Sequence, residues 1–242
     1  YASAAMRSIW TPENKIRAER RLWLTVMEAQ ADLGVSFGGD DPEQVLADYQ
    51  AVLDDVDLDS IAEREAITRH DVKARIEEFN ALAGHEHIHK GMTSRDLTEN
   101  IEQMQVLESL RLVRDKMVAT LNQLSRLAAQ FSDQAIAGRS HNVAAQVTTL
   151  GKRFATAIDE MLVAWDHVNE LIERYPARGI KGPMGTAQDM LDLLGGDESK
   201  LDDLEHRVAD HLGFNQVLTS TGQIYPRSLD FEVMSTLVQV LS

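Results

Sequence analysis

Apolar residues recur three or four positions apart over an unusually long stretch of this sequence, from residue 97 to residue 131. This spacing places them on one face of an α-helix, and roughly 35 residues at 1.5 Å each give a helix about 50 Å long. A second run with the same spacing covers residues 147–172. Because long helices with an apolar face pair in bundles, the sequence predicts an all-α fold with a long-helix bundle.

Shorter helical segments precede the long ones. A capping residue directly before a proline, which is typical of a helix start, occurs at Thr11-Pro12 and Asp41-Pro42. Periodicity predicts helices near residues 12–34, 43–53, 57–66 and 69–83. We therefore expect a small N-terminal helical domain, residues 1–97, and a central bundle domain, residues 98–242. The sequence closes in an apolar run, so we expect this bundle to be incomplete at its C-terminal end.

Composition narrows the class of protein. The 242 residues are 43% hydrophobic, which fits a globular chain, and they include no cysteine, which excludes a disulfide framework or a thiolate metal site. The formal net charge of −15 argues against a nucleic-acid partner, and no apolar run has the length of a membrane span. We expect a cytoplasmic protein in which any site for an anion is built locally.

Three short motifs look like helix starts. TRHD at residues 68–71 and TSRD at 93–96 have the spacing of a capping box, and GRSHN places Ser140 and His141 at the start of the second long helix. Helix N-termini favour anions, so three that converge would bind one. Thr93 and Ser94 would then donate hydroxyl hydrogen bonds to a carboxylate. The alternative is that each hydroxyl only caps its own helix.

The histidines divide into two groups. His85, His87 and His89 alternate and would share one face of an extended segment, as metal ligands can, but a surface loop explains His85 and His87 adequately. We expect no metal. His70 and His141 lie beside arginines at expected helix starts, where a histidine can donate a proton near neutral pH.

Two segments contain glycine in polar surroundings. RGIKGPMGTAQDM, residues 178–190, has neither the P-loop spacing nor the dinucleotide-binding spacing, so no nucleotide cofactor is expected. TSTGQIYPRSLD, residues 219–230, is a polar turn in which Gln223 is able to contact a ligand, although a loop glutamine that faces water is the commoner case.

In their order along the chain, several blocks resemble the adenylosuccinate lyase family of the fumarase and aspartase superfamily. The blocks are YAS, RRLW, TRHDV, HKGMTSRD, GRSHNVAAQVTTLGKR, RGIKGPMGT and TGQIYPRSLD. The resemblance covers nearly the whole chain. It implies an all-helical fold with a central long-helix bundle, a homotetramer with active sites shared between subunits, no cofactor, and a role in purine nucleotide biosynthesis.

The implied reaction is β-elimination of fumarate from adenylosuccinate, leaving AMP, and likewise from succinylaminoimidazole carboxamide ribotide. The substrate is thus an anionic purine nucleotide or its precursor. A proton leaves carbon beside a carboxylate, so fixed donors must stabilise the charge that develops. By the resemblance, Thr93 and Ser94 hold the succinyl part, Gln223 adds a contact, and His141 is the general acid.

Further residues are assigned by the resemblance alone. Arg69, His70 and Asp71 match a substrate-binding block, and Tyr1 matches half of an Arg-Tyr pair. The role of His89 is left open. Ser140 stands where many relatives have threonine and keeps the hydroxyl.

One expected part is missing. The family's loop of the form SSxMPxKxNP, which supplies the catalytic base serine, does not occur in the 242 residues, so we expect that serine beyond Ser242 and expect these residues alone to be inactive. Two alternatives stay open: another fumarate-releasing lyase of the superfamily, such as an argininosuccinate lyase, or a non-catalytic helical scaffold.

Overall fold

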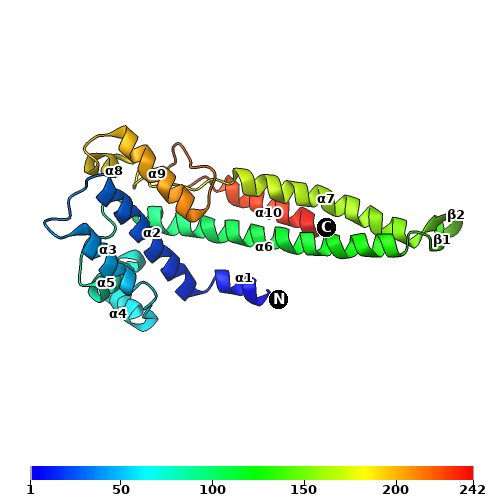
Figure 1. The fold of residues 1–242 in the computed structure, drawn as a ribbon, viewed down its shortest axis with the longest axis horizontal. Helices are drawn as coiled ribbons and strands as arrows, with labels where there is room; N and C mark the ends of the chain where they lie inside the picture. The colour runs from blue at the N-terminus through cyan, green and yellow to red at the C-terminus, as the bar shows by residue number, and fades with distance from the viewer. Residues whose placement is uncertain (1, 242) are drawn as a thin grey trace. The chain divides into compact units, whose positions relative to one another are not determined.

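The computed structural model describes residues 2–241, and nearly all of its regular structure is helical (Figure 1). The elements are α1 (Ala4–Ile9), α2 (Pro12–Asp32), α3 (Pro42–Ala51), α4 (Leu58–Thr68), α5 (Asp71–Ala83), α6 (Ser94–Gln130), β1 (Ala135–Ser140), β2 (Val143–Thr149), α7 (Leu150–Arg174), α8 (Gln188–Leu193), α9 (Glu198–Leu212) and α10 (Ser228–Leu241). Within residues 2–241, β1 and β2 are the only strands. The expected all-α class is confirmed.

The chain forms two compact units. The first contains the residues up to Glu108 together with Tyr175–Arg227, and the second contains Ser109–Arg174 together with the residues from Ser228 onward. Helix α6 runs through residue 97 without a break and contributes to both units. The domain boundary that we expected between residues 97 and 98 does not coincide with these two units. It stays a prediction.

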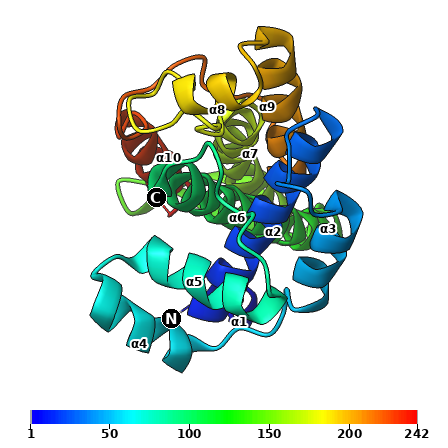
Figure 2. The ribbon, with the colours of Figure 1, turned by 90° about the vertical axis from the view of Figure 1, so that its left-hand side faces the viewer.

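Helices α2 to α5 and α9 belong to the first unit. Helix α3 contacts both α2 and α5, α4 packs on α5, and α9 lies against α2 (Figure 2). As expected, α2 begins with Thr11, whose hydroxyl accepts the N–H of Asn14 at 3.3 Å, followed by Pro12. The helix brings Trp23 into the core, where its ring stacks on Phe79 with 6.3 Å between centroids.

A buried ion pair joins α2 to α5 inside this core. Nη2 of Arg20 donates to both carboxylate oxygens of Glu78, at 2.8 and 2.6 Å, and both side chains are almost fully buried. Nη1 of Arg20 also donates to the carbonyls of Val52 and Leu53. These bonds offset much of the cost of burying the two charges. They fix how α5, which carries one of the predicted helix starts, lies on α2.

The second long helix starts later than expected. The second long helix begins at Leu150, so Val147 lies in β2 instead of on the helix, and its side chain is exposed. Ser140 pairs with Val143 across a two-residue turn whose residues, His141 and Asn142, have φ of 49° and 64°. Positive φ at both positions is the geometry of a tight hairpin turn, which suits the right-handed twist of two strands.

Helix α7 then returns along the second unit and packs on α10. Gly151, at its start, lies so close to the end of α6 that an added Cβ would stand 2.4 Å from the carbonyl oxygen of Ala128. A residue with a side chain would push the two helices apart. No helix in residues 2–241 is both long and apolar enough to cross a membrane.

Candidate active site

The predicted helix starts of α5 and α6 come together in the first unit. Nδ1 of His70, the residue before α5, accepts the N–H of Lys73 at 3.1 Å. The proton of the neutral ring therefore lies on Nε2, which is 3.3 Å from Oγ of Ser94 at the start of α6. One hydrogen bond thus joins the TRHD block to the TSRD block.

The cap of α5 differs from the one expected. Thr68 was expected to cap this helix, but it is the last residue of α4, and the capping side chain is that of His70. The reason is backbone geometry, since Arg69 has a left-handed φ of 54° that ends α4 and turns the chain before His70. The hydroxyl of Thr68 instead donates to the carbonyl of His70 at 3.1 Å.

The start of α6 is held by a buried carboxylate. Oδ2 of Asp96 accepts the N–H of Thr93 at 2.8 Å, the reach-back bond expected of the capping motif. Asp96 also accepts the N–H groups of Lys181 and Gly182, at 2.9 and 3.1 Å, and forms an ion pair with Arg178. Both charged side chains are fully buried. Helix α6 is therefore anchored to the glycine-bearing segment 178–182.

Arg178 also connects the start of α6 to a second loop, which contains Gln223 and Tyr225. Nε of Arg178 lies 3.2 Å from Oε2 of Glu99, which also accepts the N–H of Tyr225 at 2.9 Å. Nη2 of Arg178 donates to the carbonyl of Gln223 at 3.5 Å, so the backbone of Gln223 belongs to this network while its side chain is exposed. Sequence reasoning missed Arg178 and Glu99. Their signal was an arginine directly before a glycine, and an acid three residues after a capping acid. Both patterns are common without function.

Thr93 itself keeps a free hydroxyl. Across the residues that the structure describes, the side chain of Thr93 makes no hydrogen bond, and that of Ser94 bonds only His70. Both residues are partly exposed. The two hydroxyls and the first N–H groups of α6 are therefore able to donate to an anion.

His89 lies deeper in the first unit. Its Nδ1 accepts the indole N–H of Trp23 at 3.0 Å, and its backbone has a left-handed φ of 67°. Burial, and next the nearby charge of His70, lower the pKa of His89 from 6.5 to about 4. The ring is thus neutral near pH 7 and carries its proton on Nε2.

The flanks of His70 differ from each other. Arg69 is exposed, and its backbone N–H closes α4 by donating to the carbonyl of Glu65 at 2.8 Å. Asp71 accepts from Nη2 of Arg75 at 3.1 Å, one turn further along α5. Within this block, the hydrogen bonds in the structure therefore connect only His70 to the start of α6.

Ser140 and His141 lie in the second unit, and their predicted setting is wrong. Both are exposed at the tip of the β1–β2 hairpin instead of at a helix start. The third helix N-terminus expected there does not exist in the described chain, because β-branched residues at 143–149 continue the hairpin before α7 begins. Tyr1, the remaining expected site residue, lies outside the described residues.

Comparisons with known proteins fit these motifs. The chain is 34% identical to the adenylosuccinate lyase of Saccharomyces cerevisiae over 243 residues, which covers 98% of this chain and 49% of that protein. The adenylosuccinate lyase of Schizosaccharomyces pombe is also 34% identical, over 98% of this chain and 49% of its own length. The chain thus spans about half the length of these curated relatives. The expected resemblance to adenylosuccinate lyases is confirmed.

Solved structures share the fold. A fumarate lyase from Mesorhizobium sp. BNC1 superposes with a TM-score of 0.79 at 22% identity, covering 99% of this chain and 54% of that one. The 3-carboxy-cis,cis-muconate lactonizing enzyme from Pseudomonas putida gives a TM-score of 0.79 at 19% identity, with 99% and 53% covered. A family model described as lyase matches residues 2–192. Since this match covers well over half of the chain, the chain belongs to the lyase family.

Proposed function

We propose that this chain forms part of an enzyme that releases fumarate from adenylosuccinate to leave AMP, and by the same chemistry from succinylaminoimidazole carboxamide ribotide. The observation that carries the proposal is the hydrogen bond between His70 and Ser94, which joins two motif blocks at two helix starts. The similarity to adenylosuccinate lyases over 98% of the chain supports the choice of substrate. The enzyme would serve purine biosynthesis in the cytoplasm.

The start of α6 would hold the succinyl part of the substrate. Removal of a proton from carbon beside a carboxylate puts a second negative charge on that group, and fixed donors that face this charge lower the barrier. The hydroxyls of Thr93 and Ser94 and the first N–H groups of α6 are such donors. The buried Asp96–Arg178 pair would keep them in place during the reaction.

His70 would position Ser94 and also meet the substrate. Its Nε2–H donates to Oγ of Ser94, which turns the hydroxyl hydrogen away from the histidine and toward a ligand. Arg69, Asp71, His89 and Gln223 would complete the binding site. Among them, the neutral His89 would act as a hydrogen-bond donor and not as a charge.

His141 would be the general acid that protonates the departing nitrogen, with Ser140 beside it as a further contact. An exposed hairpin tip suits a residue that acts in a site shared between subunits, because the substrate and a neighbouring chain would supply the surroundings that its own unit lacks. The base is assigned to no residue of this chain, since the SSxMPxKxNP segment is absent from the 242 residues.

Exposed apolar side chains of the second unit support assembly into a homotetramer. Phe231, Met234 and Val238 lie three and four positions apart on α10 and are 73%, 65% and 63% exposed, and Val163 on α7 is 58% exposed. A soluble protein rarely leaves such a stripe in water. Neighbouring subunits of the bundle would cover it.

The test measures fumarate release from adenylosuccinate by the full-length protein, followed by absorbance. Thr93→Ala with Ser94→Ala should reduce turnover at least about a hundredfold, because the charge-stabilising donors are lost. The loss of stability should be only about 1 kcal/mol, because Thr93 makes no side-chain hydrogen bond in the described chain and Ser94 makes one, with His70. Ser199→Ala, at the start of α9, is the matched control and should leave turnover unchanged.

Two other outcomes would favour the alternatives. Fumarate release from argininosuccinate but not from adenylosuccinate would identify a different lyase of the superfamily. Normal turnover in the double variant would mean that the two hydroxyls do not stabilise the charge that develops in the reaction. If neither substrate binds, the helical-scaffold alternative is correct.

A further inference from the structure

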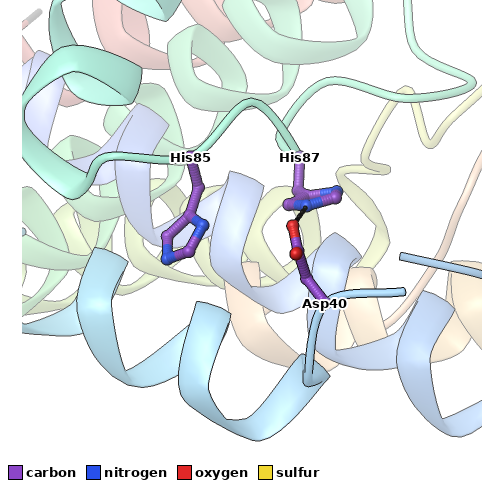
Figure 3. A group of neighbouring side chains, drawn as sticks. All are labelled: Asp40, His85 and His87. Carbon is purple, nitrogen blue, oxygen red and sulfur yellow. Dashed lines mark hydrogen bonds and ion pairs between the residues drawn. The ribbon is translucent and has the colours of Figure 1, made fainter. Parts of the chain in front are cut away.

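Three potential metal ligands gather in the first unit (Figure 3). Asp40 precedes α3, while His85 and His87 lie in the segment that follows α5. One ligand atom from each of the three residues lies within 4.8 Å of the others. The alternate spacing of the histidines puts them on one side of an extended segment, whereas His89 turns away to bond Trp23.

His85 is held in the tautomer that a metal needs. Its Nε2 lies 2.8 Å from Oδ2 of Asp48, a residue of α3, so Nε2 carries the proton and donates it to the carboxylate. Nδ1 then presents a lone pair, and no described residue donates to it. Metal-binding histidines are commonly oriented in this way, by a carboxylate that accepts the N–H of the other ring nitrogen.

His87 supplies the second nitrogen ligand, and its ring faces the carboxylate of Asp40. Its Nε2 lies 2.8 Å from Oδ2 of Asp40, and its side chain is only 12% exposed. The ring packs on Phe37 with 5.1 Å between centroids, which limits its rotation. Asp40 is 58% exposed, so the cluster opens to solvent on the side of this carboxylate.

We propose that Asp40, His85 and His87 form a binding site for Zn²⁺, with a position left for water. Imidazole nitrogens with a carboxylate are a donor set that suits this ion. Tetrahedral Zn²⁺ with bonds of 2.0–2.1 Å holds its ligand atoms about 3.3 Å apart. The closest pair, Nε2 of His87 and Oδ2 of Asp40, is 2.8 Å apart and would open slightly on binding, and the widest pair would close from at most 4.8 Å.

The positive charge of Lys90 would weaken binding of the ion, and this gives the proposal a distinctive test. Nζ of Lys90 donates to Nδ1 of His87 at 2.7 Å, which keeps the ring proton on Nε2, where Zn²⁺ would bind. An ion on Nε2 would meet the positive charge of Lys90 across the same ring, and the two charges repel each other. Removing this ammonium group should therefore tighten Zn²⁺ binding.

The experiment is calorimetric titration of the metal-free protein with Zn²⁺ alone, repeated with Co²⁺ to record the absorption bands of a tetrahedral site. We expect one ion per chain. His85→Ala and His87→Ala should abolish this binding, and Asp48→Asn should weaken it about 10- to 100-fold, the usual effect of losing a partner that orients a ligand. His206→Ala removes an exposed histidine of α9 and should leave binding unchanged.

Lys90→Met completes the series and should bind Zn²⁺ several-fold more tightly. Melting of each variant without metal shows whether it folds, and His87→Gln, which keeps a hydrogen-bonding side chain, replaces His87→Ala if that variant does not. No binding by the parent protein, or binding unchanged in the His85 and His87 variants, would overturn the proposal. Unchanged binding in Lys90→Met would also overturn it, because the ion would not then lie on Nε2 of His87.

Discussion

The start of α6 and the β1–β2 hairpin both carry residues of the proposed reaction, but they are built in opposite ways. Thr93 and Ser94 stand on a helix end that a buried carboxylate, three backbone N–H groups and an arginine hold in place. His141 stands on a two-residue turn, exposed, and within the described chain its ring makes no hydrogen bond. Hydrogen bonds and an ion pair within the first unit hold the start of α6 in place. In the hairpin, only the backbone that carries His141 is fixed.

This difference separates stability from catalysis. Where a functional residue shares its hydrogen bonds with the core, a mutation should affect both the free energy of unfolding and the reaction. Where it stands alone on a turn, a mutation should affect only the reaction. The following predictions test the comparison, from the largest expected effect to the smallest.

Asp96→Ala should have the largest effect on folding. It leaves Arg178 with one fewer partner inside the core and removes the acceptor of three backbone N–H groups, so the free energy of unfolding should fall by about 3–5 kcal/mol. Denaturant titration measures this loss. Asp115→Ala is the control, because this aspartate of α6 is 66% exposed and pairs with its neighbour Arg114. Equal losses in the two variants would remove the distinction between the two regions.

His141→Gln should affect the reaction alone. In the full-length protein, turnover should fall at least about a hundredfold, the scale of a positioned acid. The free energy of unfolding should stay within about 0.5 kcal/mol of the parent, as for other exposed positions. Rates of fumarate release and denaturant titrations on the same samples provide both values. A normal rate would remove His141 from the mechanism, and a large loss of stability would show that the hairpin tip is packed.

His89 should make stability depend on pH. The unfolded residue binds a proton below about pH 6.5, and the folded one only below about pH 4. As pH falls from 6.5 to 4, the unfolded state takes up the proton first, so the free energy of unfolding should decrease by on the order of 2–3 kcal/mol. His89→Asn, which tolerates the left-handed backbone, should lose this part of the slope, whereas His206→Asn should keep it. Identical slopes in all three proteins would mean that His89 is not buried as a neutral ring.

The two regions also show what the sequence was able to predict. The bounds of α2 and α6 follow from apolar spacing and from caps that depend on neighbours three or four residues away, and the Thr93–Asp96 bond is one of these local signals. The ion pair of Asp96 with Arg178 joins positions 82 residues apart, and no local pattern indicates that distance. The hairpin was missed because the spacing of Val147 and Leu150 fits both a helix and the strand-to-helix junction found there.

Asn142→Gly should have the smallest effect and the opposite sign. Asn142 has φ of 64° in the second position of the turn, where glycine adopts this geometry without steric cost. The substitution should stabilise the hairpin by a few tenths of a kcal/mol, and Asn142→Ala should destabilise it by about 1 kcal/mol because alanine lacks the local hydrogen bonding that makes asparagine tolerant of this conformation. Hydrogen exchange of the amides paired between β1 and β2 measures both changes locally. Because the carbonyl of Asn142 that accepts from Arg139 at 3.1 Å belongs to the backbone, it is present in both variants. If the glycine variant exchanges faster and the alanine variant more slowly, an outside partner and not local backbone preference sets the turn. The hairpin would then be held by contacts beyond its own backbone, as the start of α6 is.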